Sequence, residues 1–291
     1  MRSTRTARPA IGALILLGVA AAASGAQIVT SSESREKMPM SSVPAQQGQA
    51  LSRMTGADKP TIVLVHGAFA DGSAWRDVVP LLQRAGYKVI AVQNPLAMLA
   101  EDVATTKRVI DAETQSGRTV VAVGHSYGGA VISGAAAGNA DVRALVFIAA
   151  FAPDAGEPVG AFSEKYPSEL GAALVHDAVG FLYIDVAKYH DVFAADLPTR
   201  ETRVMAVAQR PIFGAIFGQS VPAAAWRTIP SWYLVAQEDR SINPELERFY
   251  AKRMNATTSE VKSSHLPFIS HPQRVATLIE QAARATAPTS P

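Results

Sequence analysis

Two patterns of apolar residues alternate along the chain, and their alternation predicts the class of fold. Short runs rich in β-branched residues, at 61–65 and 119–123, are typical of strands buried on both faces of a sheet. Between them, apolar residues recur at i, i+3, i+4 and i+7, which is the spacing of an amphipathic helix, and Gly86 marks its end. This first helical stripe consists of Trp75, Val78, Val79 and Leu82.

The alternation repeats after residue 86. Further strands are predicted at 88–92, 144–149, 232–236 and 257–261. Further helices are predicted at 99–110, 127–138, 243–254 and 275–282. Strands that alternate with helices in this way imply βαβ units. We therefore predict an α/β fold with a doubly wound, mostly parallel sheet that helices cover on both faces.

Residues 151–228 interrupt this rhythm. The segment is rich in proline and aromatic residues, and it is too long for an ordinary connection between neighbouring elements. We predict a helical cap insertion that lies over the sheet, within a folded domain at 59–287. Its aromatic side chains suit an apolar pocket and the cap's own core equally well, so the sequence assigns none of them to binding.

The first 26 residues are typical of a secretory signal peptide. Arg2, Arg5 and Arg8 precede an apolar run at 10–23, and small residues follow at 24–26. The run is shorter than the roughly 20 residues that span a bilayer as a helix. We therefore expect a periplasmic or secreted protein without stable membrane insertion after cleavage, and an uncleaved anchor is the alternative. The polar residues at 27–58 are interpreted as a flexible leader.

Charge and cysteine content exclude several functions. The chain has 27 Lys and Arg against 25 Asp and Glu, and the predicted signal peptide holds three of the arginines. This balance excludes the basic surface typical of proteins that bind nucleic acid through its phosphates. Because the chain has no Cys, disulfides, thiolate nucleophiles and cysteine-based metal sites are excluded.

A candidate nucleophile lies between a predicted strand and a predicted helix. Residues 124–128 read Gly-His-Ser-Tyr-Gly, which fits the G-x-S-x-G pattern in the context that this pattern requires. A sharp turn would hold Ser126 in a strained backbone conformation, and Gly124 and Gly128 would remove the side chains that otherwise collide there. We therefore predict that Ser126 is a nucleophile.

A serine hydroxyl needs a base, and His265 is the candidate among six histidines. It follows the last predicted strand, where a doubly wound sheet presents residues at its carboxyl edge. His66 is expected to shape a loop, His125 to point away from the nucleophile, and His271 to begin a helix. The remaining histidines, His176 and His190, are assigned to the surface or the core of the cap.

Asp239 is the candidate for the carboxylate that orients the base, because it follows the strand at 232–236 at the same edge. The order Ser126, Asp239, His265 is the order that this architecture uses. Glu238 and Asp154 are rival carboxylates.

The negative charge of a tetrahedral intermediate needs preorganised N–H donors. We predict an oxyanion hole built from the backbone amides of Tyr127 and Ala68. The alternative is that the loop at 66–69, which contains Ala68, only connects a strand to a helix.

At these residues the chain resembles the α/β-hydrolase superfamily over residues 60–287, and within it the small esterases similar to plant methylesterases and hydroxynitrile lyases. The motifs that carry the resemblance are His66-Gly67-Ala68-Phe69, residues 124–129, Glu238-Asp239-Arg240, and Ser264-His265. The lyases typically have Thr and Lys where this chain has Gly67 and Leu266. The resemblance therefore implies ester hydrolysis and not cyanohydrin cleavage.

We thus expect a serine hydrolase that cleaves small carboxylic esters through an acyl-enzyme, without a metal or organic cofactor. The expected partner is a small-molecule ester and not nucleic acid, and the sequence predicts no oligomeric state. Perhydrolysis, cleavage of lactones, amides or C–C bonds by the same three residues, and ligand binding with slow residual hydrolysis are the alternatives.

Overall fold

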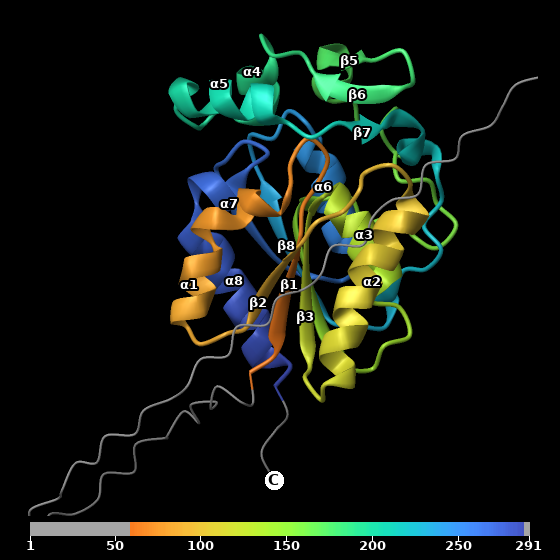
Figure 1. Ribbon diagram of the computed structural model, residues 1–291, viewed down its shortest axis with the longest axis vertical. Coiled ribbons are helices and arrows are strands. Elements are labelled where there is room, and N and C mark those ends of the chain that lie inside the picture. The colour runs from red at the N-terminus through yellow and green to blue at the C-terminus, as the bar shows by residue number, and fades with distance from the viewer. Residues whose placement is uncertain (1–58, 288–291) are drawn as a thin grey trace, which may run out of the picture. The chain divides into compact units, whose positions relative to one another are not determined.

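A computed structural model describes residues 59–287, which contain a six-stranded sheet between helices (Figure 1). The strand order is β2-β1-β3-β4-β8-β9, and every neighbouring pair is parallel. These strands are β1 (Thr61–Val65), β2 (Val89–Val92), β3 (Val120–Ser126), β4 (Val142–Ala150), β8 (Ser231–Ala236) and β9 (Thr257–Val261). The predicted fold class is confirmed, whereas the predicted signal peptide and leader lie outside the described residues.

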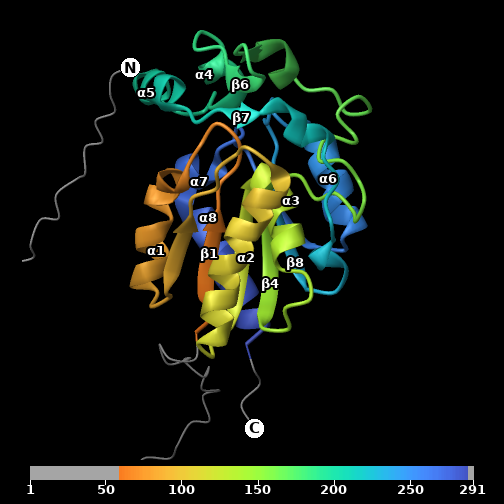
Figure 2. The same cartoon turned by 45° about the vertical axis from the view of Figure 1, so that its right-hand side comes forward.

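Helices cover both faces of this sheet, which buries its apolar strands (Figure 2). Helices α2 (Leu99–Gln115) and α3 (Tyr127–Ala135) lie on one face, and α1 (Val79–Arg84) and α8 (Pro272–Ala285) lie on the other. The other helices outside the insertion are α6 (Pro244–Arg253) and α7 (Pro267–Ser270). No helix within residues 59–287 has both the length and the hydropathy needed to cross a membrane.

The first predicted helix is divided in the structure. A 3-10 helix, η1 (Gly72–Asp77), precedes α1, which begins one residue before Pro80. Proline has no N–H to donate, so it is tolerated in the first turn of an α-helix and not in its interior. The predicted apolar stripe is nevertheless kept, because Trp75, Val78 and Leu82 are all fully buried.

The insertion at 151–228 leaves the sheet after β4 and returns to it at β8, so it lies over the carboxyl ends of the strands (Figure 1). It contains the expected helices and, in addition, a three-stranded antiparallel sheet. Its elements are η2 (Leu170–Ala173), β5 (Leu174–His176), β6 (Phe181–Ile184), α4 (Tyr189–Phe193), α5 (Thr199–Ala208), β7 (Ile212–Phe213), η3 (Gly214–Gly218) and η4 (Ala225–Arg227).

A tight turn explains this additional sheet. The Asp177 side chain accepts the backbone N–H groups of Val179 and Phe181 at 3.0 and 2.9 Å, which turns the chain from β5 into β6. Gly180, with φ +93°, supplies the left-handed residue that this turn needs.

Candidate active site

Ser126 lies on the turn between β3 and α3, at the carboxyl edge of the sheet. Its backbone has φ 51° and ψ −124°, a conformation that costs a non-glycine residue about 1–3 kcal/mol. The flanking glycines allow the turn to close. A Cβ on Gly124 would lie 2.5 Å from the carbonyl oxygen of Gly128, and a Cβ on Gly128 would lie 2.5 Å from that of Val65. The local sequence thus presents a serine where the strand ends.

The loop at 66–69 passes directly beside this serine. A Cβ on Gly67 would lie only 2.7 Å from the Cβ of Ser126. Within residues 59–287, no backbone carbonyl accepts the amide of Ala68. Tyr127 is the first residue of α3, where helix N–H groups have no partner within the helix. The two amides predicted to form an oxyanion hole therefore belong to segments that adjoin Ser126.

His66 fixes the shape of this loop, as predicted. Its Nε2 accepts the amide of Asn94 at 3.1 Å, and its Nδ1 donates to the carbonyl of Gly67 at 2.9 Å. Burial lowers the pKa of His66, which favours the neutral ring that this pair of bonds requires.

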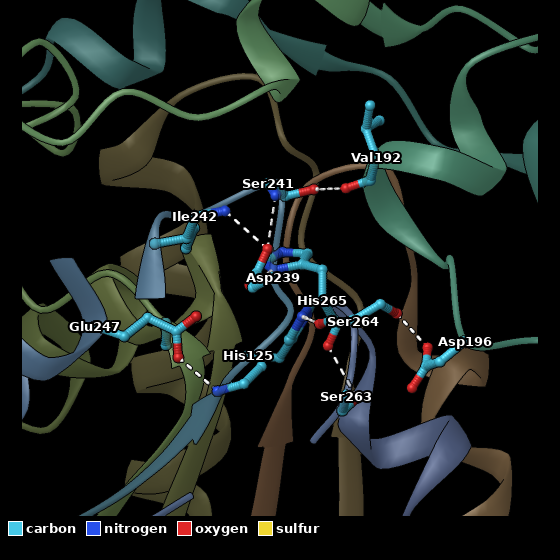
Figure 3. A network of polar contacts seen from close by, with 12 residues as sticks. His125, Val192, Asp196, Asp239, Ser241, Ile242, Glu247, Ser263, Ser264 and His265 are labelled. Carbon is cyan, nitrogen blue, oxygen red and sulfur yellow. Dashed lines mark hydrogen bonds and ion pairs between the residues drawn. The ribbon is translucent and has the colours of Figure 1, made fainter. Parts of the chain in front are cut away.

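Asp239 and His265 form a buried pair on the loops that follow β8 and β9 (Figure 3). The distance from His265 Nδ1 to Asp239 Oδ2 is 2.5 Å. The other carboxylate oxygen, Oδ1, accepts the amides of Ser241 at 2.6 Å and Ile242 at 2.9 Å. Both oxygens of Asp239 are therefore held, and Nε2 of His265 is left for a reacting group.

The rival carboxylates have other partners. The Glu238 side chain is 51% exposed and pairs with Lys262 at 3.5 Å. Asp154 forms an ion pair with Arg227. Neither carboxylate bonds to a histidine, so the geometry favours Asp239.

His125 contributes in a way that the sequence did not predict. Its Nε2 lies 2.9 Å from the carbonyl oxygen of His265. The two imidazole rings are 4.6 Å apart. Burial first, and then the nearby His265, lower the pKa of His125 well below its ordinary value, so a neutral ring donates this bond.

The other histidines lie elsewhere. His190 contacts Thr202 at 3.2 Å within the cap, and His176 is exposed. His271 is the residue at which α8 begins, as predicted, although its side chain makes no capping hydrogen bond. No group of three His, Asp or Glu side chains within residues 59–287 is arranged to hold a metal ion.

Ser126 and His265 both lie at the carboxyl edge of the sheet, but no hydrogen bond among the described residues joins them. Such catalytic bonds often form only when substrate is bound. The joint action of Ser126, His265 and Asp239 therefore stays a prediction, as does the oxyanion hole.

A cavity of about 180 Å³ lies between the cap and the loops at the edge of the sheet, and its lining includes Leu266, the residue after His265, but not Ser126, His265 or Asp239. The Phe193 ring of the cap is 5.0 Å from the His265 ring and 6.0 Å from the Phe69 ring. The apolar lining includes Phe69, Tyr189, Phe193, Met205, Leu266 and Phe268. The lining also contains the polar side chains of Asp71, Ser73, Arg76 and Gln209, so the cavity is apolar only in part.

A parallel sheet that presents a strained serine on a strand-to-helix turn and a buried Asp–His pair at the same edge defines the class of α/β hydrolases. The model of the alpha/beta hydrolase family matches residues 62–278, and the chain belongs to that family.

Individual relatives agree with this assignment. The chain is 29% identical to alpha/beta hydrolase nvfD of Aspergillus novofumigatus, over 77% of this chain and 97% of the relative. It is 25% identical to methylesterase 8 of Arabidopsis thaliana, over 74% and 86% of the two chains. Among solved structures, a pyrethroid hydrolase from Sphingobium faniae has a TM-score of 0.66 at 24% identity, covering 78% of this chain and 98% of that one, which shows the shared fold.

Proposed function

We propose that the protein is a serine hydrolase that cleaves small carboxylic esters. The observation that carries the proposal is the buried 2.5 Å contact between Asp239 and His265, at the sheet edge where Ser126 lies on its strained turn. An imidazole oriented in this way by a carboxylate is the base that a serine hydroxyl needs.

The reaction follows from these positions. Ser126 Oγ attacks the ester carbonyl carbon while its proton passes to Nε2 of His265, and Asp239 stabilises the imidazolium. The amides of Ala68 and Tyr127 donate to the oxyanion. When the intermediate collapses, the bond to the alcohol oxygen breaks and His265 returns the proton to that oxygen. Water, deprotonated by His265, then attacks the acyl-enzyme and releases the acid and Ser126.

The size and lining of the cavity support short or aromatic esters as substrates. A cavity of about 180 Å³ whose lining includes Phe69, Phe193 and Phe268 suits a compact apolar or aromatic group of a substrate. The chain is also similar to a plant methylesterase, whose name describes methyl esters as substrates, and this is consistent with an ester that has a small alcohol part. We expect p-nitrophenyl acetate, butyrate or benzoate to be hydrolysed faster than p-nitrophenyl dodecanoate, and the reverse order would contradict the substrate class.

Four variants test the assignment of residues. Ser126→Ala and Asp239→Asn are expected to lower kcat on p-nitrophenyl acetate by about 10⁴-fold. The rival carboxylates supply matched controls, because Glu238→Gln and Asp154→Asn should retain activity within about threefold. A phosphonate that reacts with serine should label Ser126, as located by mass spectrometry. Activity that persists in Ser126→Ala would overturn the proposal.

The same experiments separate the alternatives. A panel of lactones, amides, C–C substrates and esters with peroxide identifies a different reaction of the same residues. Fewer than one product per protein molecule would indicate a binding protein.

We also propose that residues 1–26 direct export and are removed. Cell fractionation followed by sequencing of the N-terminus tests this, and an intact N-terminus in the membrane fraction would indicate an anchor.

A further inference from the structure

A short segment of the cap, residues 192–196, is hydrogen-bonded to both loops that carry the Asp–His pair (Figure 3). Ser241 Oγ donates to the carbonyl of Val192 at 2.7 Å. Ser264 Oγ donates to the carboxylate of Asp196. Ser241 comes two residues after Asp239, and Ser264 immediately precedes His265. The cap therefore contacts each loop next to its candidate catalytic residue.

These hydroxyls are not ordinary surface groups. Ser241 is 4% exposed and Ser264 is 3% exposed, so a hydroxyl that lost its acceptor would be left buried and unpaired. Partial burial alone would raise the pKa of Asp196, but hydrogen bonds from Ser264 and neighbouring serines outweigh it and lower that pKa. Asp196 thus stays an ionised acceptor for the loop that precedes His265.

In addition to these two hydrogen bonds, the cap segment contacts His265 directly. Phe193 lies between Val192 and Asp196 in the chain, and its ring packs 5.0 Å from the His265 ring. Ser241 acts in two directions, because its hydroxyl bonds the cap while its amide donates to Asp239 Oδ1 at 2.6 Å. One short segment therefore contacts His265 itself, the residue before it, and Ser241, whose amide is bonded to Asp239.

We propose that residues 192–196 of the cap hold Asp239 and His265 in reactive geometry, with Asp196, Ser241 and Ser264 as positioning residues. The inference rests on the proposed hydrolase reaction. Its physical basis is that Asp239 and His265 both lie on loops beyond the ends of β8 and β9, whereas a displacement of about 1 Å in a catalytic group can cost about 100-fold in rate.

Removal of either hydrogen bond between the cap segment and these loops tests the inference. Asp196→Ala, Ser264→Ala and Ser241→Ala should each lower kcat, and the rate at which a phosphonate labels Ser126, by about 10-fold or more, with KM changed less than about threefold. The double variant Asp196→Ala/Ser264→Ala should be no slower than the slower single variant, because both changes remove one contact. Asp196→Asn keeps an acceptor oxygen and should recover most of the rate.

Ser231→Ala is the matched control. Ser231 is also buried and donates to a backbone carbonyl, that of Ile229 at 3.0 Å, but it lies at the opposite end of β8. Ser231→Ala should have the kcat and the labelling rate of the unchanged protein, even if its melting temperature falls. If Asp196→Ala unfolds at the assay temperature, Ser264→Ala carries the test, because it removes only a hydroxyl.

Three results would overturn this inference without affecting the proposed function. They are an unchanged labelling rate in folded variants of Asp196, Ser241 and Ser264, additive losses of rate in the double variant, and an equal loss of rate in Ser231→Ala. Absence of Ser126 labelling in the unchanged protein would overturn the proposed function, and this inference with it.

Discussion

His125 Nε2 donates to the carbonyl oxygen of His265 across 2.9 Å, so the residue that precedes the candidate nucleophile holds the backbone of the candidate base. The bond joins the end of β3 to the loop after β9, two segments that are 140 residues apart in sequence. Phe268 packs on the same imidazole, with ring centres 4.6 Å apart. The position of His265 therefore depends on His125 from one side and on the cap from the other.

Substitution of His125 should impair catalysis more than binding. His125→Leu removes the donor to His265, and we expect kcat to fall about 10- to 100-fold while KM changes little. His125→Gln retains an N–H donor and should be the less impaired of the two. Steady-state kinetics on p-nitrophenyl acetate check this order. Equal rates in the two variants would show that the hydrogen bond does not position His265.

Gly67 is predicted to tolerate no side chain. A Cβ there would lie 2.7 Å from Ser126 Cβ and 3.0 Å from His125 Nδ1, so Gly67→Ala must displace the nucleophile or its loop. We expect phosphonate labelling of Ser126 to slow by about 100-fold. Gly171→Ala is the control, because no heavy atom lies within 4 Å of its added Cβ. A Gly67→Ala protein that is labelled at the unchanged rate would contradict the packing described for this loop.

The sequence was informative where a local pattern determines the geometry. The turn at Ser126 needs glycines two residues on either side, and the sequence shows them. Asp239 and His265 each follow a predicted strand, and parallel strands end at the same edge of a sheet, so their common edge could be predicted. The contacts of Asp196 and Val192 could not, because they depend on the path of the cap over 68 and 49 residues of intervening sequence. No local periodicity encodes that path.

The side chain of Tyr127 should matter for stability, although only its amide is assigned to the oxyanion. Its hydroxyl donates to Asp102 Oδ2 at 2.7 Å, and both residues are fully buried. Tyr127→Phe leaves a carboxylate oxygen buried and unpaired, so we expect a loss of about 1–3 kcal/mol in the free energy of unfolding. Urea denaturation measures it, and an unchanged midpoint with an unchanged slope would refute the prediction. Weaker binding of a boronate inhibitor would show that the oxyanion amide also moves.

A second carboxyl group lies buried near Asp239. Glu247 Oε2 accepts the amide of Ala236 at 3.0 Å, while Oε1 has no partner among the described residues. Burial first, and then the charge of Asp239, raise the pKa of Glu247 well above its ordinary value. The folded protein should therefore hold a proton on Glu247 at pH values where the unfolded chain has released it.

For this reason, the free energy of unfolding of Glu247→Gln should increase relative to that of wild type as the pH rises. Above about pH 4.3 the unfolded wild-type chain loses this proton and the folded state keeps it, so wild-type stability falls by about 1.4 kcal/mol per pH unit until the folded pKa is reached. Glutamine cannot ionise, so the stability of Glu247→Gln relative to wild type should increase over this window when urea unfolding is measured at several pH values.

Glu260→Gln is the control. Hydrogen bonds from Arg248 and Gln237 lower the pKa of Glu260 to about 2, so its contribution is lost only at acid pH and its difference from wild type should be flat above about pH 5. A flat difference for Glu247→Gln as well would mean that Glu247 is ionised beside Asp239 in the folded protein.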